Sequence, residues 1–110
     1  MTRQDKGNRT FQAVSLSSNT EVVSNIPGQI CKLTGLVVAN FSSAADTVWV
    51  YVTQDGEAPS DKNTILRYTL SAEDTIADQD FDIIMRRGDK VVTKSSNGNR
   101  ITVHATIIVL

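Results

Sequence analysis

Apolar residues in this chain recur at every second position, which is the period of a β-strand and not of a helix. Residues 47–53, TVWVYVT, place three valines on one side of an extended chain and Trp49 and Tyr51 on the other. Side chains alternate between two faces along a strand, whereas a helix repeats every 3.6 residues. Residues 100–110 alternate in the same way. The chain is therefore expected to consist mainly of strands.

About eight strands fit between turn signals rich in Gly, Pro, Ser and Asn. They are expected at residues 10–17, 21–26, 29–40, 47–53, 64–70, 81–85, 91–94 and 100–110. Residues 71–75 are expected to form one helical turn or a loop. Many short strands with regular turns predict an antiparallel β-sandwich. We expect a jelly roll, with an immunoglobulin-like sandwich as the alternative.

A length of 110 residues fits one domain, which we expect to cover residues 10–110. Residues 1–9 are polar and are predicted to be an N-terminal arm that either frays or orders against a neighbouring subunit. No apolar run approaches the ~20 residues of a membrane-spanning helix. The net charge of −1 lacks the basic excess typical of nucleic-acid binding. Neither a membrane nor a nucleic acid is expected as a partner.

Few residues in the chain could carry catalytic or metal chemistry. His104 is the only histidine and Cys31 the only cysteine, so the chain cannot build a His/Cys zinc site by itself. Cys31 lies in an apolar run, where a buried and inert thiol is expected. No nucleophile elbow, phosphate loop or dinucleotide-binding motif is present. We therefore expect no enzyme activity, no cofactor and no small-molecule substrate.

One acidic stretch could bind a cation. Asp78, Asp80 and Asp82 would share one face of a strand, and clustered carboxylates can hold calcium. The glycine and the glutamate that an EF-hand loop requires are missing from the corresponding positions. A solvated strand face, balanced by the cations of residues 86–90, is the preferred interpretation.

The tripeptide Arg87-Gly88-Asp89 is used by many proteins that bind animal cell-surface receptors, but a turn explains it here. It lies between a strand ending at Met85 and another beginning at Val91. Glycine adopts backbone angles that other residues resist, and aspartate can bond its own backbone in a turn. We expect a hairpin at this position, and a second one at the Asn97-Gly98 pair.

Two stretches of the sequence resemble small virion proteins of tailed bacteriophages. The first, NIPGQICKLTGLVVANFSSAADTVWVYVT at residues 25–53, has a Pro-Gly turn, an apolar strand and then Val38-Ala39-Asn40-Phe41-Ser42. The second, IIMRRGDKVVTKSSNGNRITVHATII at residues 83–108, has the Gly88-Asp89 turn, a polar hairpin and a final alternating strand. The likeness covers roughly residues 20–110. It lies in turns and strands and includes no catalytic signature.

The resemblance implies a structural protein of the virion. Similar proteins are head decoration (cement) proteins or tail and fibre components, and they form oligomers, often trimers, of β-sandwiches. We therefore expect a decoration protein on the outer surface of the head, bound to the major capsid protein. The alternative is a tail or fibre component that contacts the host surface.

Two strands carry apolar or aromatic residues on both faces, so one face of each must be covered by something other than the core. In the last strand, Ile101 to Val109 form one apolar row, while Ile108 and Leu110 lie on the opposite face. Aromatic residues on such a second face are typical interface anchors, and a subunit interface is the preferred interpretation of Trp49 and Tyr51. The alternative is that these two aromatic residues form the core and the valines lie outside. Together with the basic residues of the arm, the predicted contact residues are Arg3, Lys6, Arg9, Trp49, Tyr51, His104, Ile108 and Leu110.

Overall fold

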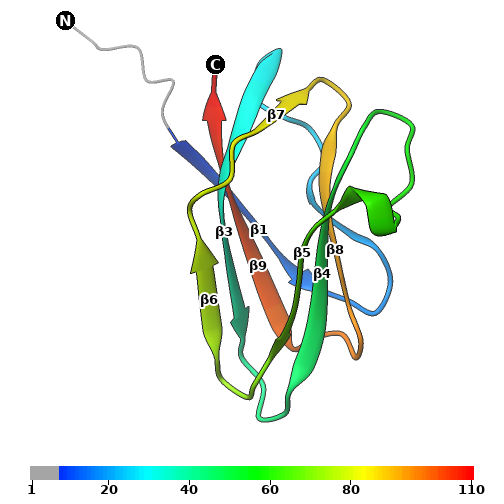
Figure 1. The fold of residues 1–110 in the computed structure, drawn as a ribbon, viewed down its shortest axis with the longest axis vertical. Helices are drawn as coiled ribbons and strands as arrows, with labels where there is room; N and C mark the ends of the chain where they lie inside the picture. Colours follow the sequence, from blue (N-terminus) through cyan, green and yellow to red (C-terminus); the bar gives the residue numbers. More distant parts are fainter. Residues whose placement is uncertain (1–7) are drawn as a thin grey trace, which may run out of the picture.

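The computed structural model describes residues 8–110, and these form two facing antiparallel sheets (Figure 1). The strands are β1 (Asn8–Ser15), β2 (Thr20–Val23), β3 (Ile30–Asn40), β4 (Asp46–Thr53), β5 (Thr64–Leu70), β6 (Thr75–Asp78), β7 (Ile83–Arg86), β8 (Lys90–Ser95) and β9 (Ile101–Val109). The one helix within this range, the 3-10 helix η1 (Asp61–Asn63), is too short to cross a membrane.

The strand order identifies a jelly roll. Sheet A has the order β1-β9-β3-β6, with β7 also paired to β3, and sheet B has the order β2-β8-β4-β5. The first strand therefore lies beside the last, and most connections pass from one sheet to the other. This double Greek-key arrangement is the one predicted, and it excludes the immunoglobulin-like alternative.

The structure has one more strand than the sequence predicts, because one edge of sheet A is divided. Both β6 and β7 pair with β3, at Leu36–Ala39 and Ile30–Leu33 respectively. The register of β3 shifts between Leu33 and Gly35, and the side chain of Gln79 lies over Gly35, where a Cβ atom would come within 2.5 Å of it. The bulge and the overlying side chain separate the two pairings. Strand β6 was missed: Thr75 was expected in a helical turn or loop, and residues 76–78 were not assigned to any of the eight expected strands.

The two predicted hairpins are wrong in their partners, although the turns are present. Strand β7 belongs to sheet A and β8 to sheet B, so residues 86–90 cross between the sheets. The Asn97-Gly98 turn likewise connects β8 to β9 in the other sheet. Gly88 and Gly98 both have positive φ, at 95° and 75°. The turn residues specify a sharp change of direction, but they do not specify the sheet in which the next strand pairs.

The core lies between the sheets and is formed by alternate residues of each strand. Its buried members are Val22, Val23, Cys31, Leu33, Leu36, Val38, Val48, Val50, Leu70, Met85, Val91, Ile101, Val103, Ala105 and Ile107. The valine row of β4 and the apolar row of β9 thus face inward, as the alternation predicts. Trp49 and His104 consequently lie on the outer faces of the two sheets.

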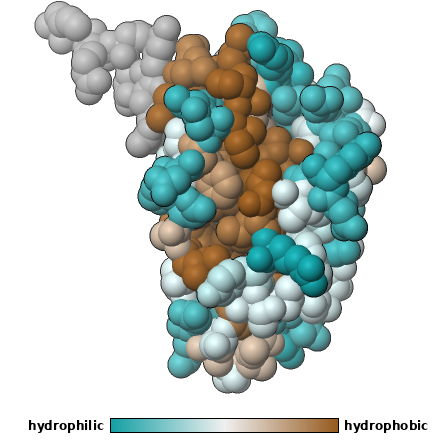
Figure 2. All heavy atoms as spheres, viewed as in Figure 1, coloured by the Kyte–Doolittle hydropathy of each residue, from teal (hydrophilic) through white to brown (hydrophobic). Residues whose placement is uncertain are grey.

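The sandwich is less completely closed along the edge where β5 faces β6 and β7. Figure 2 shows a band of hydrophobic residues between the two sheets on this side of the molecule. Ile65, Leu66, Ile76, Phe81 and Ile83 are only partly buried against the core, and Tyr68 is 46% exposed. The short β6 and β7 leave this edge more open than a full-length strand would.

Candidate functional site

The Arg87-Gly88-Asp89 tripeptide forms a tight turn that its own hydrogen bonds hold in place. The amide N–H of Asp89 donates to the carbonyl oxygen of Arg86 at 2.9 Å, and Oδ2 of Asp89 accepts from the Arg86 amide at 2.9 Å. The carboxylate therefore satisfies backbone at the turn, as residues of this type commonly do. The predicted turn at the tripeptide is confirmed.

Replacing Gly88 with alanine is expected to lower the free energy of unfolding by about 1–3 kcal/mol. The backbone is in the left-handed region, and an added Cβ would lie 2.5 Å from Cγ of Asp55. Gly56→Ala is the control, because Gly56 has a similar φ of +78° and open space around it. The difference between the two variants in thermal melting therefore measures the part of the loss that comes from the clash with Asp55. Equal losses in the two variants would contradict the clash.

A surface pocket of about 430 Å³ lies between the 54–65 segment and the β7–β8 turn. Its two carboxylates already have structural partners. Oε1 of Glu57 accepts from the Gln54 amide at 2.9 Å and from Nδ2 of Asn63 at 3.1 Å, and Asp89 holds the turn described above. The hydrogen bond from Gln54 is the main reason that the pKa of Glu57 is lowered. The carboxylates hold the loop and the turn, which is a sufficient reason for their positions.

The acidic stretch does not form the single strand face that the alternation predicts. Asp78 ends β6, and Asp80 and Asp82 lie in the connection to β7. Oδ1 of Asp78 accepts from the amide of Asp80 at 2.9 Å, and Asp82 pairs with Lys32 at 3.2 Å. Among residues 8–110, no three side chains of metal-ligand type converge. We call residues 73–82 the acidic segment.

The outer face of sheet A is broad and carries little charge. His104 lies at its centre, between Gln12 of β1 and Val37 of β3 in the strand register. Ile108 is half-buried in the same row of β9. Val14 and Ile84 on this face are 41% and 45% exposed. Val14 lies beside Thr102 at one end of β9, whereas Ile84 lies at the other end and is separated from Ile108 by Lys32. The two exposed apolar side chains are therefore far apart and do not form one patch.

The outer face of sheet B is aromatic and basic. Trp49 of β4 is half-buried and lies opposite Arg67 of β5 and Lys94 of β8 in the strand register. The guanidinium carbon of Arg67 is 5.8 Å from the centroid of the indole ring, and Nζ of Lys94 is 5.4 Å from it. Both distances fall within the range of a cation–π interaction. We call these three residues the Trp49 patch.

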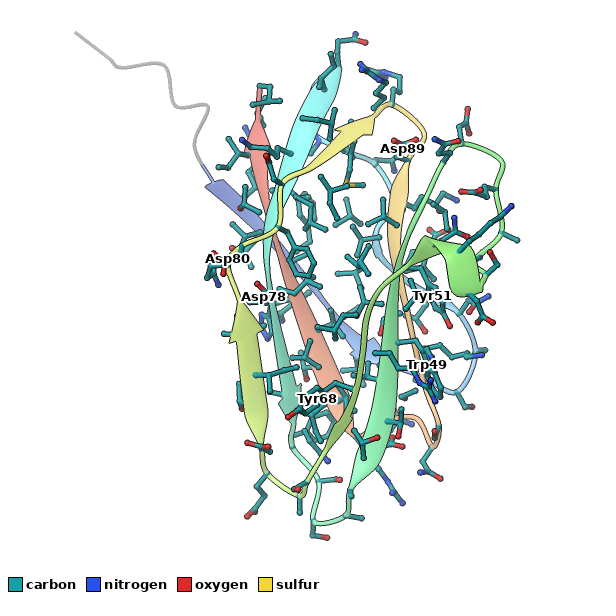
Figure 3. The ribbon with its side chains drawn as sticks, viewed as in Figure 1. Trp49, Tyr51, Tyr68, Asp78, Asp80 and Asp89 are labelled. Carbon is teal, nitrogen blue, oxygen red and sulfur yellow. The ribbon has the colours of Figure 1, made fainter. Side chains whose placement is uncertain are left out.

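Tyr51 is already covered within its own chain. It lies beside η1 on the same side of the molecule as Trp49 (Figure 3), and only 5% of it is exposed. Burial, and secondarily the nearby charge of Asp61, raises the pKa of its hydroxyl above the usual 10.0. Trp49 therefore remains as the accessible aromatic residue of the predicted pair.

The predicted contact residues do not form one surface. Trp49 and Tyr51 lie on sheet B, while His104 and Ile108 lie on sheet A, and Leu110 is exposed just beyond β9. Arg3 and Lys6 lie outside the described residues. Arg9 was predicted to belong to the arm, but it lies in β1 opposite Ile107. The sequence reasoning also missed Arg67 and Lys94, whose approach to Trp49 depends on the strand register.

Cys31 is fully buried in the core, as expected, and its Sγ donates to the carbonyl oxygen of Pro27 at 2.6 Å. Burial raises the pKa of the thiol above its ordinary 9.0, and the charge of Arg9 opposes this in part. Because the folded thiol holds its proton more tightly than the unfolded one, its contribution to stability is complete below about pH 9 and is lost as the pH rises further.

We therefore expect the stability of the protein to fall above about pH 9. Tyr51, with its raised pKa, should add to the fall at still higher pH. Urea unfolding at intervals between pH 7.5 and 10.5 measures this, and Cys31→Ala should make the decline shallower. A variant that declines as steeply as the parent would remove Cys31 from the explanation.

A search of protein-family models and of curated protein sequences found no match. Among solved structures, the chain is similar to a protein from disulfide-linked pili of Bacillus endospore appendages, with 10% identity and a TM-score of 0.45 over 100% of this chain and 97% of that one. It is also similar to the coat protein of Tobacco streak virus, with 9% identity and a TM-score of 0.40 over 98% and 90% of the two chains.

A third similar structure is a pentameric capsid protein isolated from metagenomic phage sequences. It has 16% identity and a TM-score of 0.43, with 98% of this chain and 64% of that one covered. At these identities and scores the similarities do not assign a function to the chain.

Proposed function

We propose that this chain is a structural protein of a tailed-bacteriophage particle, and that it is a decoration protein bound to the major capsid protein on the outside of the head. The observation that carries this proposal is the outer face of sheet A, where the outward row of β9, formed by Thr102, His104, Thr106 and Ile108, carries no formal charge. Such a face favours contact with another protein surface. The sequence resemblance described above supplies the kind of particle.

The proposed mechanism is mechanical and involves no catalysis. A homo-oligomer of sandwiches, with a trimer as the favoured state, would bridge neighbouring capsid subunits and bury surface that internal pressure tends to separate. A protein that binds only the assembled lattice stabilises that lattice by mass action. The compact core between two sheets suits this role, because a close-packed interior transmits force with little deformation.

Immunogold electron microscopy of intact particles, with antibody against this protein, tests the proposed location. Label scattered over the head supports a decoration protein. Label confined to the tail tip or fibres would replace it with the alternative, a module that contacts the host surface. The observation that favours this alternative is the Trp49 patch, because an aromatic and basic surface suits an acidic glycan. Particles without label would overturn both.

Removing residues 1–7 is expected to weaken binding to capsids by about tenfold or more, equivalent to about 1.4 kcal/mol. Arg3 and Lys6 would supply charged contacts to a neighbouring subunit. The deletion stops before Asn8 because β1 begins there, so the melting temperature should not change. Co-sedimentation of the protein with particles that lack it measures the affinity. Binding equal to that of the full chain would exclude the arm from the contact.

A further inference from the structure

The Trp49 patch places two cations beside one indole ring, and within residues 8–110 neither has a carboxylate partner. Arg67 and Lys94 approach the indole ring from strands on either side of β4. The ion pairs formed among residues 8–110 involve Lys32 and Lys90 instead. Two like charges beside one ring repel each other, and a bound anionic group would relieve that repulsion. The patch is therefore suited to a negatively charged partner surface.

The chain carries a surface of the opposite sign elsewhere. The acidic segment has five carboxylates and no lysine or arginine within residues 73–82. Of these five, only Asp82 forms an ion pair among the described residues, and its side chain remains 79% exposed. The remaining members are Glu73, Asp74, Asp78 and Asp80, and all but the half-buried Asp78 are exposed. A net charge of −1 thus conceals a separation of charge between two surfaces.

The two surfaces face opposite sides of the molecule. In Figure 3, Asp78 and Asp80 lie at the outer edge of sheet A, while Trp49 lies on sheet B across the core from them. One copy therefore cannot bring its acidic segment to its own patch. A second copy can, and the same contact then repeats from each copy to the next. Contacts of this head-to-tail kind close into rings or extend into filaments.

We propose that the Trp49 patch binds the acidic segment of a second copy of this chain, so that the copies associate head to tail. The inference rests on the proposed oligomeric structural role and names the surfaces that build the oligomer. Charge complementarity identifies the occupant, because every copy supplies one patch and one acidic segment. Arg67 and Lys94 would lie against the carboxylates around Asp80, with the edge of the indole ring between the two cations.

A charge-swap experiment tests the proposal. Variant R67E/K94E makes the patch acidic, and variant D80K/D82K makes residues 80–82, the part of the acidic segment proposed to lie against the patch, basic. Each variant alone places like charges against each other, so its association should weaken at least about 100-fold in sedimentation velocity. In an equal mixture, every acidic patch finds a basic segment and every basic patch finds an acidic one. The mixture should therefore recover the mass of the wild-type oligomer.

The matched control is R86E/R87E, which reverses the same number of charges at exposed positions outside both surfaces. It should associate like the wild type. Circular dichroism and melting show whether each variant is folded; the exposed pair between Lys32 and Asp82 contributes little to stability. Trp49 is the only tryptophan, so its emission also reports directly on the patch and should change when wild-type copies associate.

Three results would overturn the inference. They are variants that still associate like the wild type, a mixture that stays dissociated, and a wild-type chain whose patch binds an acidic glycan but no second copy. The proposed function has a separate test. If antibody labels the phage head but the charge swap fails, the role as a decoration protein stands and this interface is excluded. If the swap restores the oligomer but no particle is labelled, the interface stands and the decoration role is excluded.

Discussion

Replacing Asn40 with alanine is expected to lower the free energy of unfolding by about 2–4 kcal/mol, because several partners would lose their bonds in a buried place. Asn40 is buried at the end of β3. Its Nδ2 donates to the carbonyl oxygens of Ala44, Leu70 and Ser71 at 2.8, 3.3 and 3.2 Å. Its Oδ1 accepts from the amide and the hydroxyl of Ser42 at 2.9 and 2.8 Å. One side chain thus joins the β3–β4 loop to the end of β5.

Urea unfolding followed by circular dichroism measures this loss, with parent and variant at the same protein concentration because association adds to apparent stability. Asn63→Ala is the matched control. Oδ1 of Asn63 accepts from Ser60 and its Nδ2 donates to Glu57, but these bonds lie in a solvated loop. We expect the control to cost about 1 kcal/mol or less. Ordinary surface substitutions change the free energy of unfolding by no more than about 0.5 kcal/mol. A change this small in Asn40→Ala would contradict the role of Asn40.

Much of this fold can be predicted from alternation, because burial on one side of a strand is a local property. The valines of β4 and the isoleucines of β9 face the core where the pattern places them, and the predicted span of β5 matches the structure. The turns at residues 86–90 and 97–98 were also found, since positive φ at glycine is local. The partner of a strand is not local, and for this reason the two predicted hairpins connect different sheets.

The divided edge of sheet A could not be predicted for a related reason. Residues 75–78 include only Ile76 and Ala77 as apolar members, which is too short a run for alternation to identify. They form a strand because β3 offers a free edge beside them, and the bulge at Gly35 sets where that edge ends. Tertiary pairing overrides weak local preference here.

The candidate surface was predicted only in part. Alternation placed Trp49 on the outer face, but it gave no indication that Tyr51 lies beside η1 or that Arg67 and Lys94 flank the indole. Both facts depend on long-range contacts: the path of the 54–63 loop and the register of β4 with its two neighbours. Arg67 and Lys94 could be assigned to Trp49 from the sequence only if the pairing of β5 and β8 with β4 were already known.

Trp49→Ala is expected to have the largest effect on association, weakening it by roughly 30- to 1000-fold, which corresponds to about 2–4 kcal/mol. Tryptophan and arginine are enriched among the few interface residues that carry most of the binding energy. In this chain the indole also makes cation–π contacts with Arg67 and Lys94. Its removal therefore takes away the apolar contact and releases both cations. Trp49→Phe keeps a ring between the cations and should lose less.

Sedimentation velocity over a concentration series measures the dissociation constant, with Tyr68→Ala as the control. Tyr68 is as accessible as an interface residue must be, at 46% exposure, but it lies at the open edge between the sheets and not in the Trp49 patch. Loss of association in Trp49→Ala with little change in Tyr68→Ala locates the contact on sheet B. The reverse result would locate it at the β5 edge, where the apolar band between the sheets would then be the surface that a second copy covers.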